Sequence, residues 1–390
     1  MRPNEFSVII RIQLFWLSYW VAIKNRLRKS AFSRFEPEVP IEKARHLVPS
    51  DYFQFKADSV LNAGAIDPKQ LNKKEVRDFA RSTLRRLLKL QQLECDVSSV
   101  FRSSKDDGFV IERRYISFGL MRDCPIEVVT HEKFTDKPSP LMICMQGYNS
   151  GAHLSLGRVI EPYDVYKVAS GSSIALDAAR LGFRALSYER PCFGERSETK
   201  LHKPIPNPTV DASFSALMVG ETLMGQTVSE ISSLIDWADQ QFGCVELGTY
   251  ISGYSAAGTT AIFASAVDER IDGIAVGGCI GKFRDTDMQR GTNGYVAIPD
   301  LLKYFEFDAI MGLSAPRILV AVSGVDDHIF PFRGAEECFE SAKSAFWSEG
   351  AEAAILHLKG ERGHTYYPEQ LWPAFIEAIN LRSRTTGKSI

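Results

Sequence analysis

The stretch ISGYSAAG, residues 251–258, decides how the rest of the chain is interpreted. An apolar segment leads into Gly253 and Tyr254, Ser255 follows, and a run of small residues comes next. This strand–turn–helix pattern is typical of a nucleophile elbow, a tight turn that holds a serine hydroxyl clear of a sheet. The turn demands small residues two positions before and after the serine, and Gly253 and Ala257 meet that demand. Taken alone, the pattern also fits a serine that merely caps a helix.

A serine hydroxyl is a weak nucleophile by itself, so Ser255 requires a base, and the base requires an acid to orient it. An elbow of this kind predicts the chain order serine, acid, histidine. The apolar run ILVAVSG, residues 318–324, ends shortly before Asp326, Asp327 and His328. An acid just beyond the carboxyl end of a strand suits this role, so we predict Asp327, with Asp326 as the alternative.

The last predicted strand lies in AAILHLKG, residues 353–360, and His364 follows it closely. We predict that His364 takes the Ser255 proton and returns it to the leaving group. His328 precedes this strand and His357 lies within it, which makes both weaker candidates. His364 alone would also fit a surface loop histidine, but the chain order and the strand contexts favour Ser255, Asp327 and His364 as one catalytic set.

A second loop, in LMICMQGYNSG at residues 141–151, supplies the predicted oxyanion hole. Gly147 allows close backbone approach, and we predict that the N–H groups of Tyr148 and Ala256 bind the oxyanion. Glycine-rich loops also bind phosphates, but no Walker lysine or G-x-G-x-x-G pattern accompanies this one. Ordinary packing is the alternative for the residues predicted to contact substrate, which are Gln146, Gly147, Tyr254, Phe330 and Tyr366.

Short apolar runs alternate with helical stretches along much of the chain. This alternation predicts a mostly parallel sheet with helices on both faces. Strands are predicted at 141–145, 183–188, 245–252, 271–276, 317–322 and 353–358, and an antiparallel pair at 109–118 and 126–132. Helices are predicted across 175–180, 213–242 and 260–266.

Residues 125–380 resemble the α/β-hydrolase superfamily, nearest its acetyl xylan esterase and dienelactone-hydrolase-like branch. Beyond the predicted triad, the likeness is carried by ERPCFGERS at 189–197, by residues 217–238 and by residues 298–331. The resemblance implies the α/β-hydrolase fold, with a mostly parallel central sheet flanked by helices. It also implies hydrolysis of a small-molecule carboxylic ester through an acyl-Ser255 intermediate, with no metal or organic cofactor.

Two positions depart from the family pattern. Gln146 stands where the family usually has histidine, and Ala257 stands where it often has glycine. Neither change removes a backbone donor, but both leave room for altered substrate choice. An acyltransferase, thioesterase or lactonase with the same triad is the alternative function. A non-catalytic binding protein that keeps the fold is a third interpretation, which the intact set of three residues disfavours.

Residues 1–107 are predicted to form an N-terminal helical region, and residues 108–390 the catalytic domain. Asp67 followed by Pro68 predicts a helix start, and apolar residues continue at helical spacing. This region is a candidate cap, dimerisation element or membrane-surface element.

Residues 6–23, FSVIIRIQLFWLSYWVAI, are mostly apolar and are followed by the basic stretch KNRLRK. A helix packed on the body or in a homodimer interface, a membrane-surface anchor, and a spanning or cleaved segment are all open. Arg11 and Gln13 interrupt the run, and no small-residue cleavage site follows.

The composition narrows the remaining function classes. The formal net charge of -2 gives no global electrostatic case for binding nucleic acid. The seven cysteines are scattered and lack C-x-x-C spacing, which disfavours a zinc knuckle and a disulfide framework. They favour a reducing compartment, so a cytoplasmic location is expected, with peripheral membrane attachment through residues 6–23 as the alternative.

Overall fold

The computed structural model describes residues 49–119, 123–198, 208–290 and 293–386. Ala57–Ile390 belong to one compact unit, which carries every predicted catalytic residue. The apolar stretch at residues 6–23 lies outside the described residues. No helix among the described residues is long and apolar enough to cross a membrane.

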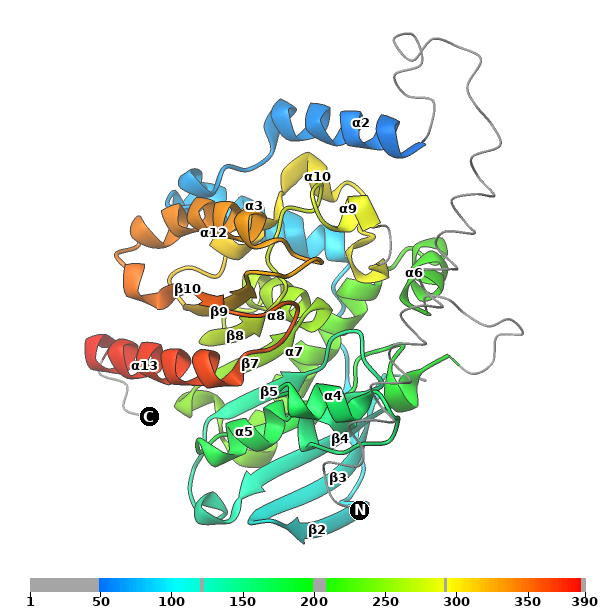
Figure 1. Ribbon diagram of the computed structural model, residues 1–390, viewed down its shortest axis with the longest axis vertical. Helices are drawn as coiled ribbons and strands as arrows, with labels where there is room; N and C mark the ends of the chain where they lie inside the picture. Colours follow the sequence, from blue (N-terminus) through cyan, green and yellow to red (C-terminus); the bar gives the residue numbers. More distant parts are fainter. Residues whose placement is uncertain (1–48, 120–122, 199–207, 291–292, 387–390) are drawn as a thin grey trace. The chain divides into compact units, whose positions relative to one another are not determined.

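The described strands form one ten-stranded sheet in the order β1-β3-β4-β6-β5-β7-β8-β9-β10 (Figure 1). β1 and β2 both pair with β3, each with a different part of it. The strands from β1 to β4 are antiparallel, and β4 also pairs antiparallel with β6. From β6 through β10 neighbouring strands are parallel, so their carboxyl ends meet at one edge of the sheet. The strands are β1 Cys95–Val97, β2 Arg102–Asp106, β3 Phe109–Phe118, β4 Asp123–His131, β5 Leu141–Met145, β6 Arg184–Tyr188, β7 Thr249–Tyr254, β8 Gly273–Gly277, β9 Ile318–Gly324 and β10 Ile355–Gly360.

Helices cover both faces of this sheet. Side chains alternate along β5, where Ile143 joins one apolar cluster and its neighbours Met142 and Cys144 join another. The first cluster packs against α3, α7, α8, α11 and α12, and the second against α5 and α13. The described helices are α2 Pro49–Gly64, α3 Lys74–Leu88, α4 Asp164–Ala169, α5 Ile174–Arg180, α6 Pro208–Met218, α7 Leu223–Phe242, α8 Ala256–Val267, α9 Asp287–Arg290, α10 Leu301–Tyr304, α11 Phe307–Gly312, α12 Phe332–Trp347 and α13 Pro368–Thr386. A strand buried on both faces reads as a continuous apolar run, which is why β5 and β9 are easy to recognise in the sequence.

The predicted sheet is confirmed, with shifts of a few residues at the strand ends. β3 and β4 are the predicted antiparallel pair, and β5 to β10 are the predicted strands that alternate with helices. The largest shift is at β7, which begins at Thr249 because Val245–Leu247 form a 3₁₀ turn.

The single helix predicted across 213–242 is wrong, because the chain forms two helices there. α6 ends at Met218 and α7 begins at Leu223. Thr222 has extended backbone angles, and its hydroxyl accepts a hydrogen bond from the Gly225 N–H at 2.9 Å. A threonine N-cap of this kind starts a new helix instead of continuing an old one.

The prediction of an all-helical region up to residue 107 is also wrong in part. β1 and β2 lie within it, and the side chains of β2 are mostly exposed. Such short polar strands bury little apolar surface and depend on their pairing with β3, so they leave no helical or strand periodicity to recognise. The division of the chain at residue 107 into two functional parts stays a prediction.

The predicted helix start at Asp67 is confirmed as a cap but not as the start of a long helix. The Asp67 carboxylate accepts a hydrogen bond from the Lys69 N–H at 2.9 Å. The turn it caps is the short 3₁₀ helix Pro68–Gln70, and α3 begins only at Lys74.

Candidate active site

Ser255 lies in the sharp turn between β7 and α8. Its backbone angles are φ 56° and ψ −129°, a conformation that residues with a side chain rarely adopt. The Ser255 N–H donates a hydrogen bond to the Gly277 carbonyl at 2.8 Å, which ties the turn to the neighbouring strand β8. The side chain thus stands at the carboxyl edge of the sheet, immediately before the N-terminus of α8, whose dipole favours negative charge there.

A continuous chain of hydrogen bonds joins the three predicted catalytic residues. Ser255 Oγ lies 3.0 Å from His364 Nε2, and His364 Nδ1 lies 2.8 Å from Asp327 Oδ2. They come from three places along the sheet edge: the end of β7, the loop after β9 and the loop after β10. Asp327 is buried and contacts the imidazole, whereas its neighbour Asp326 is exposed.

Both oxygens of the Asp327 carboxylate are engaged. Oδ2 faces His364, and Oδ1 accepts hydrogen bonds from the N–H groups of Ile329 at 2.8 Å and Phe330 at 2.9 Å. Burial opposes ionisation, but the hydrogen bond and charge of His364 and these two N–H groups outweigh it. They hold the pKa of Asp327 below its usual value. The carboxylate is therefore ionised at neutral pH and fixed in orientation.

Two aromatic rings hold the imidazole of His364. The Phe330 ring stacks on it at 6.0 Å between centroids, and the Tyr254 ring lies at 4.9 Å on a tilted plane. The Tyr254 hydroxyl donates to the His364 carbonyl at 2.7 Å. Tyr254 and Tyr366 also line a cavity of about 130 Å³ beside His364. The structure therefore brings these three predicted contact residues to the base.

The loop after β5 lies directly against the elbow. A Cβ atom on Gly147 would be 2.7 Å from the Tyr254 carbonyl oxygen and 2.8 Å from Ser255 Cβ, so only glycine fits there. The next residue, Tyr148, shares a hydrogen bond between its phenol oxygen and the Thr209 hydroxyl, and its ring packs edge-to-face with Phe193. The loop therefore approaches Ser255 with its backbone, which is the placement expected of the predicted oxyanion loop.

Gln146 is placed differently from the other predicted contact residues. Its side chain is buried, and its amide N–H groups donate to Ser155 Oγ at 2.9 Å and to the Ser172 carbonyl at 2.7 Å. The side chain is thus engaged inside the protein, where it anchors the oxyanion loop to the segment before α5.

Arg190 and Glu189, at the end of β6, hold this loop and were not predicted. The Arg190 Nε–H donates to the Gln146 carbonyl at 3.0 Å, and the guanidinium lies between the rings of Phe193 and Tyr295. The Glu189 carboxylate accepts from the Ala152 N–H at 2.9 and 3.0 Å, and burial raises its pKa to about 7. Both residues fall in the segment 189–197 that carries the family likeness, but no motif indicates a contact with the loop after β5.

Among the described residues, no group of three or more His, Cys, Asp or Glu side chains is placed to hold a metal ion. All seven cysteines are free thiols, and six of them are buried. The chemistry that the described arrangement supports is that of a serine nucleophile with a histidine base.

Comparisons with known proteins find similarity at the level of structure. No protein-family model and no curated protein sequence matches the chain. A candidate acetyl xylan esterase from Bacteroides fragilis superposes with a TM-score of 0.64 at 17% identity, covering 84% of each chain. A methylesterase gives 0.58 at 15% identity, covering 85% of this chain and 69% of its own. A glucuronoyl esterase from Solibacter usitatus superposes with a TM-score of 0.56 at 13% identity, covering 80% of this chain and 94% of its own.

These likenesses accompany a mixed sheet of ten strands with helices on both faces. The chain therefore has the α/β-hydrolase fold, as the sequence resemblance implied.

Proposed function

We propose that the protein is a serine hydrolase that cleaves a small-molecule carboxylic ester through an acyl-Ser255 intermediate. The observation that carries this proposal is the hydrogen-bonded series Asp327, His364 and Ser255, with Ser255 in a strained turn at the sheet edge. The similar solved structures support it, because the proteins they represent are named as esterases.

In the first half of the reaction, Ser255 Oγ attacks the ester carbonyl while His364 Nε2 takes its proton. The negative charge that develops on the carbonyl oxygen is bound by the N–H groups of Ala256 and Tyr148. The ionised Asp327 stabilises the imidazolium, which then gives its proton to the leaving alcohol as the tetrahedral intermediate collapses to the acyl-enzyme.

In the second half, a water molecule attacks the acyl carbonyl and His364 takes the water proton. The intermediate collapses, the acid product leaves, and the proton returns to Ser255 Oγ. Gly147, Tyr254, Phe330 and Tyr366 form the immediate surroundings of this chemistry. We assign Gln146 a supporting contact behind the oxyanion loop instead of a contact with substrate.

The test uses the wild-type protein and Ser255→Ala with a fluorophosphonate probe and p-nitrophenyl acetate. We expect the probe to label the wild type at Ser255 and to leave the variant unlabelled. We expect kcat to fall by at least about 10³-fold, because removing the nucleophile disables the whole triad. Ser82→Ala, at an exposed serine of α3, is the control and should behave as wild type. An unlabelled wild type, or a variant that keeps its activity, would contradict the proposal.

A further inference from the structure

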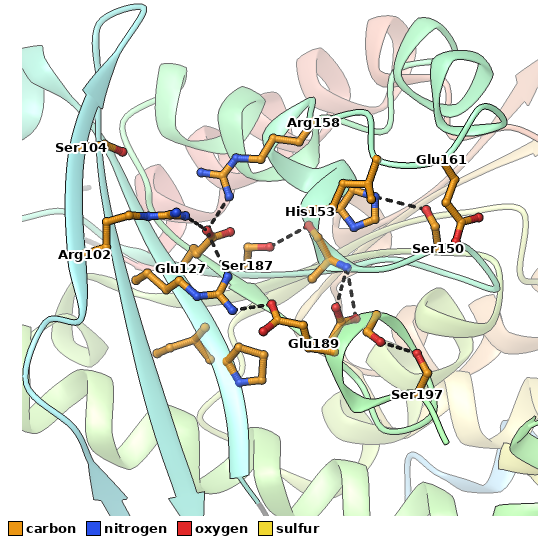
Figure 2. Close-up of a pocket in the computed structure, with 17 residues that line it drawn as sticks. Arg102, Ser104, Glu127, Ser150, His153, Arg158, Glu161, Ser187, Glu189 and Ser197 are labelled. Atoms are coloured by element: carbon orange, nitrogen blue, oxygen red, sulfur yellow. Dashed lines mark hydrogen bonds and ion pairs between the residues drawn. The ribbon is translucent and has the colours of Figure 1, made fainter. Parts of the chain in front are cut away.

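A cavity of about 770 Å³ lies away from the triad, where β2, β3, β4 and β6 meet the loops that follow β5 and β6. We call it the arginine cavity, because Arg102, Arg113 and Arg158 line it together with Glu127 (Figure 2). The other lining residues include four serines, three glutamates and His153, with no Phe, Tyr or Trp among them. These groups offer hydrogen bonds and charges to a polar ligand.

Three guanidinium groups surround the carboxylate of Glu127. Its carboxylate is buried, and guanidinium nitrogens of Arg158, Arg113 and Arg102 lie 2.5, 3.5 and 3.8 Å from it. Figure 2 shows Arg102 and Arg158 pointing toward Glu127 from two sides. Arg113 has a second acidic partner in Glu195. Arg102 and Arg158 have Glu127 as their common acidic partner.

Arg102 is the side chain best able to receive a ligand. Its nearest carboxylate is 3.8 Å away, beyond hydrogen-bonding distance, and the side chain is 57% exposed. Within the described ranges, no hydrogen bond of its guanidinium group is found. Arg158 uses one nitrogen on Glu127 and is 34% exposed. A guanidinium group presents N–H donors in a fork that matches a carboxylate, so these two side chains suit a carboxylate ligand.

The other acidic groups of the cavity limit the charge of that ligand. Glu189 is buried beside Ala152, and Glu161 is exposed at the rim. The lining holds four glutamates against three arginines, so a doubly charged phosphate would add more negative charge beside Glu189 and Glu161 than a single carboxylate does. The cavity therefore favours a monoanion.

Strand register relates the cavity to the nucleophile. Arg102 pairs with Arg113, which pairs with Glu127, and Glu127 pairs with Ser187 of β6. The same row continues through Cys144 of β5 to Ser252 of β7, three residues before Ser255. Three strand spacings separate Glu127 from Ser252, which is roughly 14 Å.

The oxyanion loop connects the two places. Gly147 touches the elbow, and Ser150, Ala152 and His153 of the same segment line the cavity. His364 comes from the far side of the nucleophile, after β10, and it must protonate the leaving group. An acyl group that points away from His364 would extend toward β5, β6 and the arginine cavity.

We propose that the arginine cavity binds the distal carboxylate of an extended acyl group, with Arg102 and Arg158 as its ligands. This inference rests on the proposed function, because it names the substrate class of the same site. It predicts an esterase that prefers acyl chains ending in a carboxylate over neutral chains of equal length.

The experiment uses p-nitrophenyl hemiesters of straight-chain dicarboxylic acids of increasing length, each compared with its methyl-capped, neutral counterpart. For the wild type we expect kcat/KM for the acidic series to pass through a maximum at a chain that reaches the cavity, with no such maximum for the capped series. Arg102→Ala should raise KM for the best acidic substrate about tenfold or more, since a hydrogen bond to a charged group is lost. It should leave kcat and the activity on p-nitrophenyl acetate unchanged.

Lys105→Ala is the matched control, because Lys105 is an exposed cation on the same strand that does not line the cavity. Lys105→Ala should keep the wild-type preference for acidic over methyl-capped acyl chains. Equal kinetics for acidic and capped chains at every length, or the same effect of Arg102→Ala on both series, would overturn the inference while leaving the proposed hydrolase function in place.

A binding measurement separates this inference from the proposed function. Titration calorimetry on Ser255→Ala uses the monoethyl hemiester with the chain length that the wild type cleaves best, or every chain length if none is cleaved. We expect the double variant Ser255→Ala/Arg102→Ala to bind this hemiester about tenfold more weakly than Ser255→Ala does. The diethyl ester should bind equally to both proteins. If the hemiester binds no better than the diethyl ester, the cavity does not bind a carboxylate, whether or not the wild type cleaves esters.

Discussion

Asp327 shows how much of this site depends on the placement of a single carboxylate. Its two oxygens have different partners, the imidazole of His364 on one side and two backbone N–H groups on the other. Asp326, the preceding residue, is exposed, so the two adjacent aspartates have different environments despite their identical chemistry. This contrast provides a test within one loop.

Asp327→Asn should lower kcat on p-nitrophenyl acetate by about 10³- to 10⁴-fold, because an amide stabilises the wrong imidazole tautomer and no imidazolium. Asp326→Asn should keep nearly wild-type activity. Steady-state kinetics of the two variants, with circular dichroism to verify folding, measures the difference. Loss of activity in Asp326→Asn with little change in Asp327→Asn would reverse the assignment of the acid.

At the residue scale the sequence was informative where a motif demands particular residues. The proximity of Ser255, Asp327 and His364 was predictable because the elbow fixes their order and their strand contexts, while their catalytic roles stay predictions. Gln146 and Arg190 were not predictable, since the direction of a side chain in a loop depends on partners far away in the sequence. For Gln146 these partners are Ser155 and Ser172.

At the scale of elements, the break between α6 and α7 depends on Thr222. Besides capping α7, its hydroxyl donates to the Leu88 carbonyl at 2.8 Å, at the end of α3. One buried hydroxyl therefore caps the start of one helix and gives the last carbonyl of another a hydrogen-bond partner. The sequence did not reveal this, because the contact with Leu88 crosses more than one hundred residues of chain.

Thr222→Ala should lower the free energy of unfolding by about 1–2 kcal/mol, since it removes the cap and leaves the Leu88 carbonyl without its partner. Thr222→Ser keeps the hydroxyl and should cost much less. Urea denaturation of both variants measures the difference. Equal losses in the two variants would mean that the methyl group, and not the hydroxyl, matters at this position.

At the scale of the whole molecule, burial of Glu189 links global stability to pH. The pKa of Glu189 is raised to about 7 in the folded protein, above its ordinary value of 4.5. Between these values the folded state holds more protons than the unfolded state, so stability falls as pH rises. The stabilising contribution is complete below about pH 4.5 and is lost as pH passes through 7.

Glu189→Gln should therefore gain stability relative to wild type between pH 5 and pH 8, by on the order of 2 kcal/mol. The amide oxygen can still accept the Ala152 N–H, so the loop contact is kept. Glu246→Gln, at an exposed carboxylate, should show no such trend. Chemical denaturation at several pH values measures the free energy of unfolding, and a parallel pH profile for Glu189→Gln and wild type would disprove the link.

The alternation of strands and helices made the overall fold predictable, because each buried strand is recognisable by itself. The edge formed by β1 and β2 was not predictable, since polar strands are stabilised only by a partner. The arginine cavity was not predictable either, because it exists only where segments distant in the sequence come together. Its walls come from five separate segments, and no motif indicates that they meet.

The strained backbone of Ser255 also lowers the stability of the folded protein at the residue that the proposed activity requires. A positive φ at a residue with a side chain costs about 1–3 kcal/mol, whereas the added freedom of glycine in the unfolded chain costs only about 0.5–1 kcal/mol. Ser255→Gly should thus give a protein that is inactive but melts at a higher temperature than wild type. The strained serine is thus a trade-off between thermal stability and the proposed catalytic role of its hydroxyl.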